Sequence, residues 1–175
     1  MTRQAENPVP TWGAEVCETP WVVQSLWWHY LYTMDKDFLR HRAFGPICEA
    51  VQFLNAYMRR PDAHGPQWKD DKFHIYPTVV PELHGLKVDP AFSADCIVDL
   101  TLTRFVFKAY LEACKVLGCQ QEEAVLMREV QEILDHFPDI FSDHLQCRLL
   151  LTLLEPRKAP AHHAPEVRYH GERGR

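Results

Sequence analysis

Apolar residues recur at helical spacing in four stretches of the chain, and this periodicity restricts the fold more than any other feature. Between Trp21 and Met34 they fall at positions 22, 23, 26, 27, 30 and 31, close to the 3.6-residue period of an amphipathic helix. No stretch of useful length alternates apolar and polar residues in the way that a half-buried strand does. The sequence therefore predicts an all-α fold.

Local signals set the expected limits of the first two helices. The dipeptide Thr19-Pro20 predicts the start of the first helix, because Thr is a good N-cap and Pro fits the first helical turn. This helix should end near Met34. The second helical region should run over 37–60, and Pro46 predicts a break or kink near Gly45.

The third and fourth helices follow a long loop. The third is expected to start near Ser93 or Asp95 and to end at Leu117, since Gly118 is a natural residue for a left-handed C-terminal stop. The fourth should occupy 120–136 and end before Pro138. The four helices would form two helical hairpins, joined by the loop that precedes the third helix.

The last part of the chain departs from this pattern. From Pro156 onward, five Lys or Arg against two Glu give a charge of +3, which leaves −8 on residues 1–155 because the whole chain carries −5. Few apolar residues accompany these charges, so disorder is predicted there. The expected organisation is an irregular lead-in over 1–18, a helical domain over 19–138 and an atypical, largely disordered tail over 139–175.

Charge and composition exclude several classes of protein. A net charge of −5 argues against nucleic acid as the main partner, and no run of 18 apolar residues predicts a membrane span. No apolar stretch precedes Trp12, so the visible start is not a signal peptide, and localisation stays open.

Six cysteines without a CxxC pair are interpreted as reduced residues, and Cys48, Cys96 and Cys114 fall in apolar helical patterns. Ten histidines show no zinc-site spacing, so no metal or other cofactor is expected.

The pair Pro81-Glu82 places a carboxyl group in the irregular segment between the two helical regions. Two aromatic residues and a histidine lie near it in the sequence (Phe73, Tyr76, His84), and almost no other charged residue is nearby. Desolvation in such surroundings raises a carboxyl pKa toward neutrality, which suits a general acid. The alternative is an ordinary solvated or helix-capping glutamate.

Several motifs agree in order with one enzyme family. They are Glu-Thr-Pro-Trp21, Leu26-Trp-Trp-His-Tyr-Leu-Tyr-Thr-Met-Asp35, Pro77-Thr-Val-Val-Pro-Glu82 and Ala113-Cys-Lys-Val-Leu-Gly118. Together they resemble the catalytic (α/α)6 barrel of family 95 glycoside hydrolases, the α-L-fucosidase family among the six-hairpin glycosidases. The resemblance covers roughly residues 10 to 138. It implies that this chain forms part of an (α/α)6 toroid, about two of its helical hairpins.

The resemblance also assigns roles to individual residues. Glu82 matches the Glu of the family's Pro-Glu loop, which implies a general acid. Trp21 matches a Trp that faces the sugar, and Asp99 matches an Asp with a supporting role. This chain has Glu-Thr-Pro before Trp21 where the family has Gly-Gly-Ala, and Val-Asp99 where it has Met-Asp. These departures allow a substrate other than a fucoside.

Each of these residues also has a purely structural interpretation. Trp21 offers a flat face for sugar C–H groups, or it is a core aromatic of the first turn. His29, about two turns along the same helix face, either lines the pocket or is a satisfied structural histidine. Asp99 is a pocket residue or a hydrogen-bonded helix-terminal aspartate. Tyr76 and His84 flank the acid and could orient it.

Two parts of the family pattern have no match in this sequence. They are an Asn-x-Asn pair upstream of the acid and an Asp far downstream, which together activate water. We therefore expect a fragment of a hydrolase of O-glycosidic bonds, with a carbohydrate substrate, inactive alone and broken after about residue 139. Its apolar helix faces would lack partners, and the full-length parent could be exported. The alternative is a non-catalytic helical protein that binds carbohydrate or acts as a scaffold; the oligomeric state is not predicted.

Overall fold

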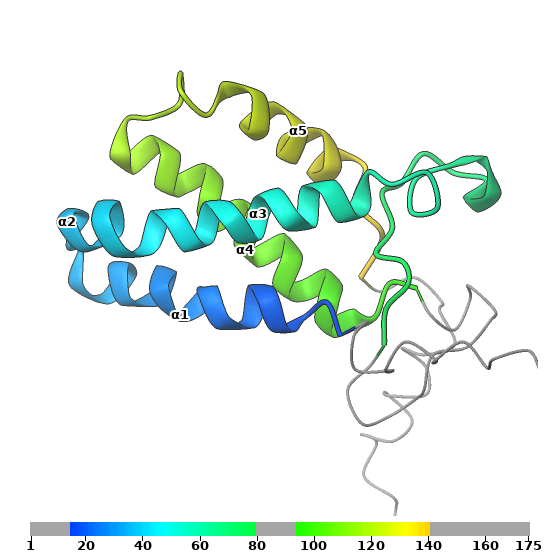
Figure 1. The fold of residues 1–175 in the computed structure, drawn as a ribbon, viewed down its shortest axis with the longest axis horizontal. Coiled ribbons are helices and arrows are strands. Elements are labelled where there is room, and N and C mark those ends of the chain that lie inside the picture. Colours follow the sequence, from blue (N-terminus) through cyan, green and yellow to red (C-terminus); the bar gives the residue numbers. More distant parts are fainter. Residues whose placement is uncertain (1–14, 80–93, 141–175) are drawn as a thin grey trace, which may run out of the picture.

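Two helical hairpins lie side by side in the computed structural model, which describes residues 15–79 and 94–140 (Figure 1). The four long helices are α1 (Glu18–Thr33), α3 (Phe44–Met58), α4 (Ile97–Leu117) and α5 (Ala124–Asp135). Helices α1 and α3 form the first hairpin and α4 and α5 the second. No strand occurs in the described ranges. The all-α prediction is confirmed for these residues, and their arrangement fits part of an α/α toroid.

Helix α1 begins earlier than its sequence signals indicate. Its N-cap residue is Cys17, whose side chain makes no capping hydrogen bond, and Thr19 lies inside the first turn. The predicted Thr19 cap is therefore wrong by two residues. Pro20 is still tolerated, because the first N–H groups of a helix have no intrahelical partner to lose. At the other end Met34 adopts a left-handed conformation with φ 55°, and its N–H donates to Tyr30 O at 2.7 Å.

The second helical region is helical throughout, and its α-helical geometry is interrupted just before Gly45 by a π-helical turn in place of the predicted break or kink at that residue. Helix α2 (Lys36–Phe38) is capped by the Asp35 carboxylate and leads into a π-helical turn, η2 (Leu39–Ala43), and then into α3. Pro46 is the third residue of α3. The wide π turn directly before it supplies an extra residue, which accommodates a ring that has no N–H and would crowd the i−4 carbonyl of a regular helix.

The core lies between α3, α4 and the two outer helices. Fully buried side chains come from α3 (Ile47, Leu54), α4 (Phe107, Tyr110) and α5 (Ile133). Burial of large apolar side chains on three helices at once fixes the two hairpins against each other, at about 1.5–3 kcal/mol for each side chain. This packing determines how the ends of the helices are placed.

The second hairpin follows its prediction at the end of α4 and departs from it at the start of both helices. Helix α4 begins at Ile97 and not near Ser93 or Asp95. Helix α4 ends at Leu117, and Gly118 follows in the left-handed conformation with φ 73°, as predicted. Helix α5 begins at Ala124 and not near Gln120. The difference has a tertiary cause, because the Glu123 carboxylate turns back to accept a hydrogen bond from Tyr110 Oη at 2.6 Å.

All five described cysteines are free, in agreement with the predicted reduced state (Cys17, Cys48, Cys96, Cys114, Cys119). Cys96 and Cys114 are buried as expected, whereas Cys48 is only half-buried. Burial raises the pKa of both Cys96 and Cys114 to about 12, so these thiols stay protonated. None of the described helices is long and apolar enough to span a membrane.

The ends of the chain were expected to be irregular, and most of these residues lie outside the described ranges. The lead-in was placed at 1–18 and the tail at 139–175. Of these, only residues 15–18, 139 and 140 are described. The predicted domain boundaries therefore stay predictions.

Candidate functional site

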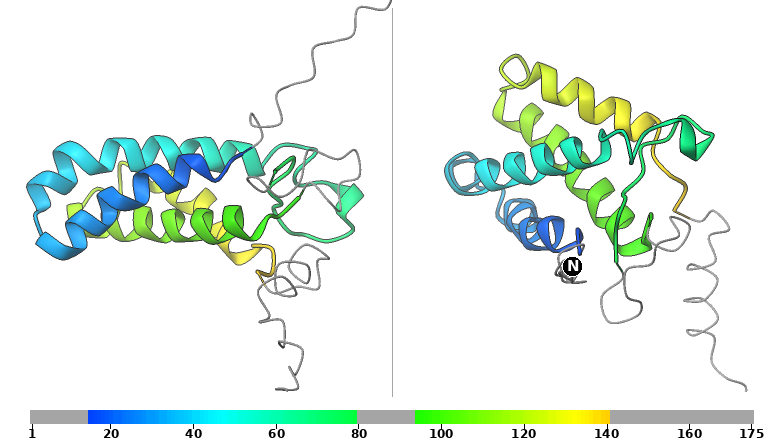
Figure 2. Two further views of the ribbon diagram at one scale, coloured as in Figure 1. Left: turned by 90° about the horizontal axis from the view of Figure 1, so that it is seen from below. Right: turned by 45° about the vertical axis from the view of Figure 1, so that its right-hand side comes forward.

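Three segments meet at one end of the helical hairpins: the start of α1, the extended segment Phe73–Val79 and the start of α4 (Figures 1 and 2). The extended segment leaves the loop that follows α3 and runs past the first turns of α1 and α4. Asp95 N donates to Ile75 O at 3.0 Å, and the Asp95 carboxylate accepts from Ile75 N at 2.9 Å. These two bonds fix the entry to α4 against the extended segment.

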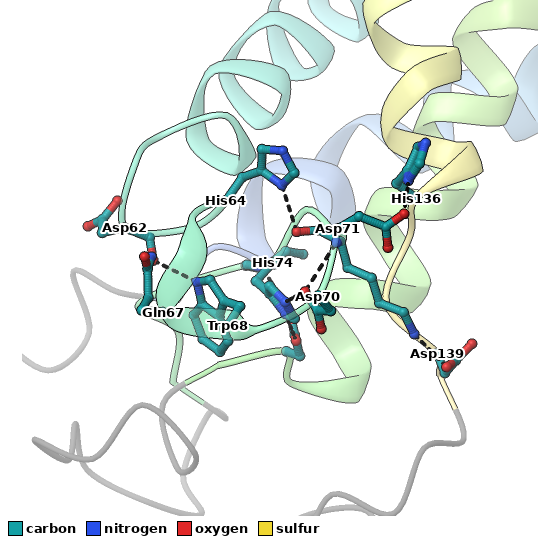
Figure 3. Close-up of polar contacts among 12 residues, drawn as sticks. Asp62, His64, Gln67, Trp68, Asp70, Asp71, His74, His136 and Asp139 are labelled. Atoms are coloured by element: carbon teal, nitrogen blue, oxygen red, sulfur yellow. Dashed lines mark hydrogen bonds and ion pairs between the residues drawn. The ribbon is translucent and has the colours of Figure 1, made fainter.

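A chain of polar groups, buried at His74 and Asp95 and exposed at Asp70, strengthens this junction (Figure 3). His74 Nδ1 lies 2.5 Å from Asp95 Oδ2, and His74 Nε2 lies 3.1 Å from Asp70 Oδ1. His74 and Asp95 are only 4% and 3% exposed. Asp95 has a left-handed backbone with φ 54°, an uncommon conformation that this set of contacts stabilises.

The pKa of His74 reflects a balance of opposing effects. Burial alone would lower it, but the hydrogen bond and negative charge of Asp95, assisted by Asp70, raise it above its ordinary value. The same histidine reciprocally lowers the pKa of Asp70, against the opposing effect of burial. We therefore interpret Asp70–His74–Asp95 as an ion-paired structural link, in which each imidazole nitrogen of His74 contacts one carboxylate.

The other side of the extended segment is attached to the end of α5. Phe73 N donates to His136 O at 3.1 Å, and Lys72 Nζ lies 2.6 Å from Asp139 Oδ2. His136 Nδ1 lies 3.0 Å from Asp71 Oδ2 (Figure 3). The segment is thus held by both helices of the second hairpin.

Asp99, in the first turn of α4, is completely buried at this junction. Thr78 Oγ1 donates a short hydrogen bond to Asp99 Oδ2. Burial raises the pKa of Asp99 to about 7, against the opposing effects of Thr78, the Cys17 backbone and the Cys96 thiol. Its other oxygen, Oδ1, has no hydrogen bond of normal geometry among the described residues.

Trp21 lies on the surface of α1 with 62% of the side chain exposed. It lines a cavity of about 460 Å³ together with Glu15, Cys17, Glu18, Val22 and Val98. The alternative of a core aromatic is therefore wrong. An exposed indole beside two carboxylates is an arrangement that can take a sugar ring.

Tyr76 lines a second cavity, of about 440 Å³, together with Pro61, Asp62, Gln67 and Trp68. The two cavities have no lining residue in common. Each cavity is lined by at least one aromatic side chain and at least one carboxylate. In residues 15–79 and 94–140, no three His, Cys, Asp or Glu side chains form a group that could hold a metal ion.

The model of the glycosyl hydrolase family 95 catalytic domain matches residues 1–144 of the chain. The chain belongs to glycosyl hydrolase family 95. Comparison with curated proteins gives no match. Membership of this glycosidase family makes a carbohydrate the class of substrate, and it confirms the family that the sequence motifs indicated.

In this family 95 chain, two of the expected site residues lie outside the described residues. They are Glu82 and His84, both in 80–93. The residues on either side of that stretch, Val79 and Ala94, are buried at the junction described above. The general-acid role of Glu82 and the orienting role of His84 therefore stay predictions.

His29 lies in the half of α1 away from this junction. Its imidazole is exposed and packs against the ring of Phe38 on α2, with ring centroids 4.0 Å apart. Eight residues separate it from Trp21, a rise of roughly 12 Å along a helix. The structure does not bring His29 together with Asp99 and Tyr76, and its part in substrate binding stays a prediction.

Sequence analysis missed four residues that build the site: Trp68, Asp70, Thr78 and Asp95. Trp68 lies in the long loop before the third helix, where a single Trp among Pro, Gly and charged residues is a signal for a packed loop. The pairing of His74 with Asp95 spans 21 positions, and no local pattern reveals it. Thr78 had one signal, its place four residues before Glu82.

Proposed function

We propose that this chain carries the general-acid side of an O-glycoside hydrolase site, α-L-fucosidase-like in its motifs, with Glu82 as the acid. The observation that carries the proposal is the anchoring of Phe73–Val79 by Asp95 and Asp99. Glu82 follows Val79 by three residues, so the acid-bearing stretch leaves a fixed and buried point. A catalytic acid needs such positioning, because small displacements cost much of the rate.

The acid must be protonated at working pH in order to protonate the leaving oxygen. The described residues that flank the 80–93 stretch in sequence, Tyr76, Val79 and Ala94, are aromatic or apolar. Aromatic and apolar neighbours favour the protonated form of a carboxyl that packs against them, because they solvate its charged form poorly. We assign the proton-donor role to Glu82 on this basis.

Trp21 is proposed to bind the sugar ring at the same end of the molecule. Its exposed indole and the Glu15 and Glu18 carboxylates line one cavity. Apolar C–H groups of a sugar pack on an indole face, and sugar hydroxyls donate to carboxylates. The Cys17 backbone N–H acts on Asp99, so this cavity borders the buried junction.

An inverting hydrolase also needs a group that activates water, about 6.5–9.5 Å from the acid. The family's water-activating residues have no match in this sequence. We therefore propose that Glu82 and the residues around it catalyse hydrolysis only together with a further part of a toroid. The chain alone should bind saccharides without hydrolysing them. Hydrolysis of 4-nitrophenyl α-L-fucoside by the purified chain would contradict this part of the proposal.

The acid role is tested in the longest natural gene product that contains this chain. Glu82→Gln should lower kcat on a natural glycoside by about 10²–10⁴. The same variant should retain its kcat on a glycosyl fluoride, because fluoride leaves with little protonation. Loss of both activities would indicate a folding defect, and near-normal hydrolysis of the natural glycoside would show that Glu82 is not the acid. Binding with no turnover in any gene product would favour the non-catalytic alternative.

A further inference from the structure

The cavity beside Tyr76 is built by a loop that closes on itself. Trp68 Nε1 donates to Asp62 O at 3.0 Å, and Gln67 Nε2 donates to Pro61 O at 2.8 Å. A Cβ at Gly65 would lie 2.5 Å from both Pro61 O and Gln67 Oε1, so the loop leaves no room for any other residue there. The walls of the cavity are therefore held in place before a ligand arrives, which lowers the cost of binding.

The indole of Trp68 is fixed on one side by the ion-paired link. Its ring stacks on His74 with centroids 3.9 Å apart and an interplanar angle of 20°. His74 is in turn held by Asp70 (Figure 3) and by Asp95. His74 thus holds the indole from one face, and Trp68 lines the cavity in this fixed position.

Tyr76 forms an adjoining wall of the same cavity. Its ring meets that of Trp68 edge-on, with centroids 5.7 Å apart and an angle of 73°. Two aromatic rings at such an angle make a corner that contacts a flat ligand on its face and along one side. The Tyr76 backbone is also held, because Arg60 donates a short hydrogen bond to Tyr76 O.

The polar groups at the cavity are acceptors suited to hydroxyl groups. Asp62 Oδ1 lies 3.2 Å from Arg60 Nε, and 55% of the Asp62 side chain remains exposed. Gln67 uses Nε2 for the loop contact, which leaves Oε1 as an acceptor. A carboxylate at the wall disfavours an anionic ligand, and the acceptors favour a ligand with several O–H groups over a purely apolar one.

We propose that the cavity formed by Pro61, Asp62, Gln67, Trp68 and Tyr76 is a second carbohydrate subsite, which binds a neutral sugar ring against the aromatic rings of Trp68 and Tyr76. The inference rests on the proposed function, since it assumes a saccharide substrate. It extends that function to a second ring of the substrate. Tyr76 belongs to the segment that leads to Glu82, so the subsite and the acid are connected through Phe73–Val79.

Saturation-transfer NMR on the full chain, with L-fucose, D-galactose and lactose as probes, tests the subsite. Trp68→Ala should weaken binding of at least one sugar by about tenfold, the factor that corresponds to a loss of about 1.4 kcal/mol. Trp68→Phe should retain part of it. Trp28→Ala is the matched control, because Trp28 is 45% exposed on α1 and lines neither described cavity. Equal affinities of Trp68→Ala and Trp28→Ala would overturn the subsite.

Two further variants keep the test decisive if Trp68→Ala unfolds the loop, as judged by circular dichroism. Gln67→Ala and Asp62→Asn change exposed side chains, and each should weaken binding. Unchanged affinity in both would overturn the second subsite. No saturation transfer to any of the three sugars would overturn both this subsite and the sugar binding proposed for Trp21. Loss of binding in Trp21→Ala alone would also overturn the second subsite, while leaving the proposed function in place.

Discussion

Asp99 shows how a single carboxyl can join three parts of the chain. It lies in the first turn of α4, accepts a hydrogen bond from Thr78 and is influenced by the Cys17 backbone at the start of α1. Thr103, four residues later on the same face of α4, has a buried hydroxyl without a hydrogen-bond partner in the described part of the chain. Such a polar and under-bonded interior is unusual outside functional sites.

The stability of the protein should therefore depend on pH through Asp99. Its pKa is about 7 in the folded chain against a reference value of 3.8, so folding takes up a proton between these limits. The contribution of Asp99 is complete below about pH 3.8, falls as pH rises and is lost above about pH 7. Asp99→Asn removes this dependence. When the pH is raised from about 5 to about 8, the free energy of unfolding of wild type should fall by about 3 kcal/mol relative to that of Asp99→Asn.

Urea unfolding of both proteins at the two pH values measures this difference. Asp37→Asn serves as the control, because it makes the same chemical change at an exposed position on α2, away from the buried junction. If wild type and Asp99→Asn differ by the same free energy at both pH values, Asp99 does not carry the raised pKa.

At the scale of the elements, the end of α4 depends on a backbone conformation that favours glycine. Gly118 has φ 73°, and its N–H bonds back to carbonyls of the last helical turn. A Cβ at this position would meet no atom within 4 Å. Any cost of substitution therefore comes from the backbone and not from a clash.

Gly118→Ala should destabilise the protein by about 1 kcal/mol, since an L-residue with a Cβ disfavours the left-handed region. Gly118→Asn should cost less, because Asn tolerates this conformation better than Ala. The two variants differ little in their surroundings, so their order in urea unfolding isolates the backbone effect. Equal stability of Ala, Asn and wild type would show that the helix end relaxes to another conformation.

The elements also show how far sequence reasoning reaches. Apolar spacing predicted all four long helices, because the stripe that each helix buries is local in sequence. The late start of α5 was not predictable from 120–123, since it follows from the contact of Glu123 with Tyr110. In the site, sequence motifs pointed to Trp21 and Asp99. The place of Trp68 in the site followed only from its stacking on His74 in the structure.

At the scale of the whole molecule, α1 has an apolar surface that the described chain leaves uncovered. Trp21, Val22, Trp28, Leu31, Tyr32 and Met34 are all between 45% and 89% exposed. Trp21, Trp28 and Tyr32 are seven and four residues apart and so share one face of the helix. Monomeric proteins rarely expose apolar side chains in such a contiguous group. This is the unpaired helix face that part of a toroid would present.

The purified chain should therefore associate with itself as its concentration rises. Replacing Val22 and Leu31 by Glu places charges on either side of the face that Trp21, Trp28 and Tyr32 share. The double substitution should weaken association by about tenfold or more, because about 1.4 kcal/mol of lost apolar burial gives that factor. Sedimentation velocity over a range of concentrations measures the effect. Val125→Glu is the matched control, since Val125 is 60% exposed on α5, away from this face. A chain that stays monomeric at all concentrations, or an equal response to Val125→Glu, would show that the surface of α1 is not a contact face.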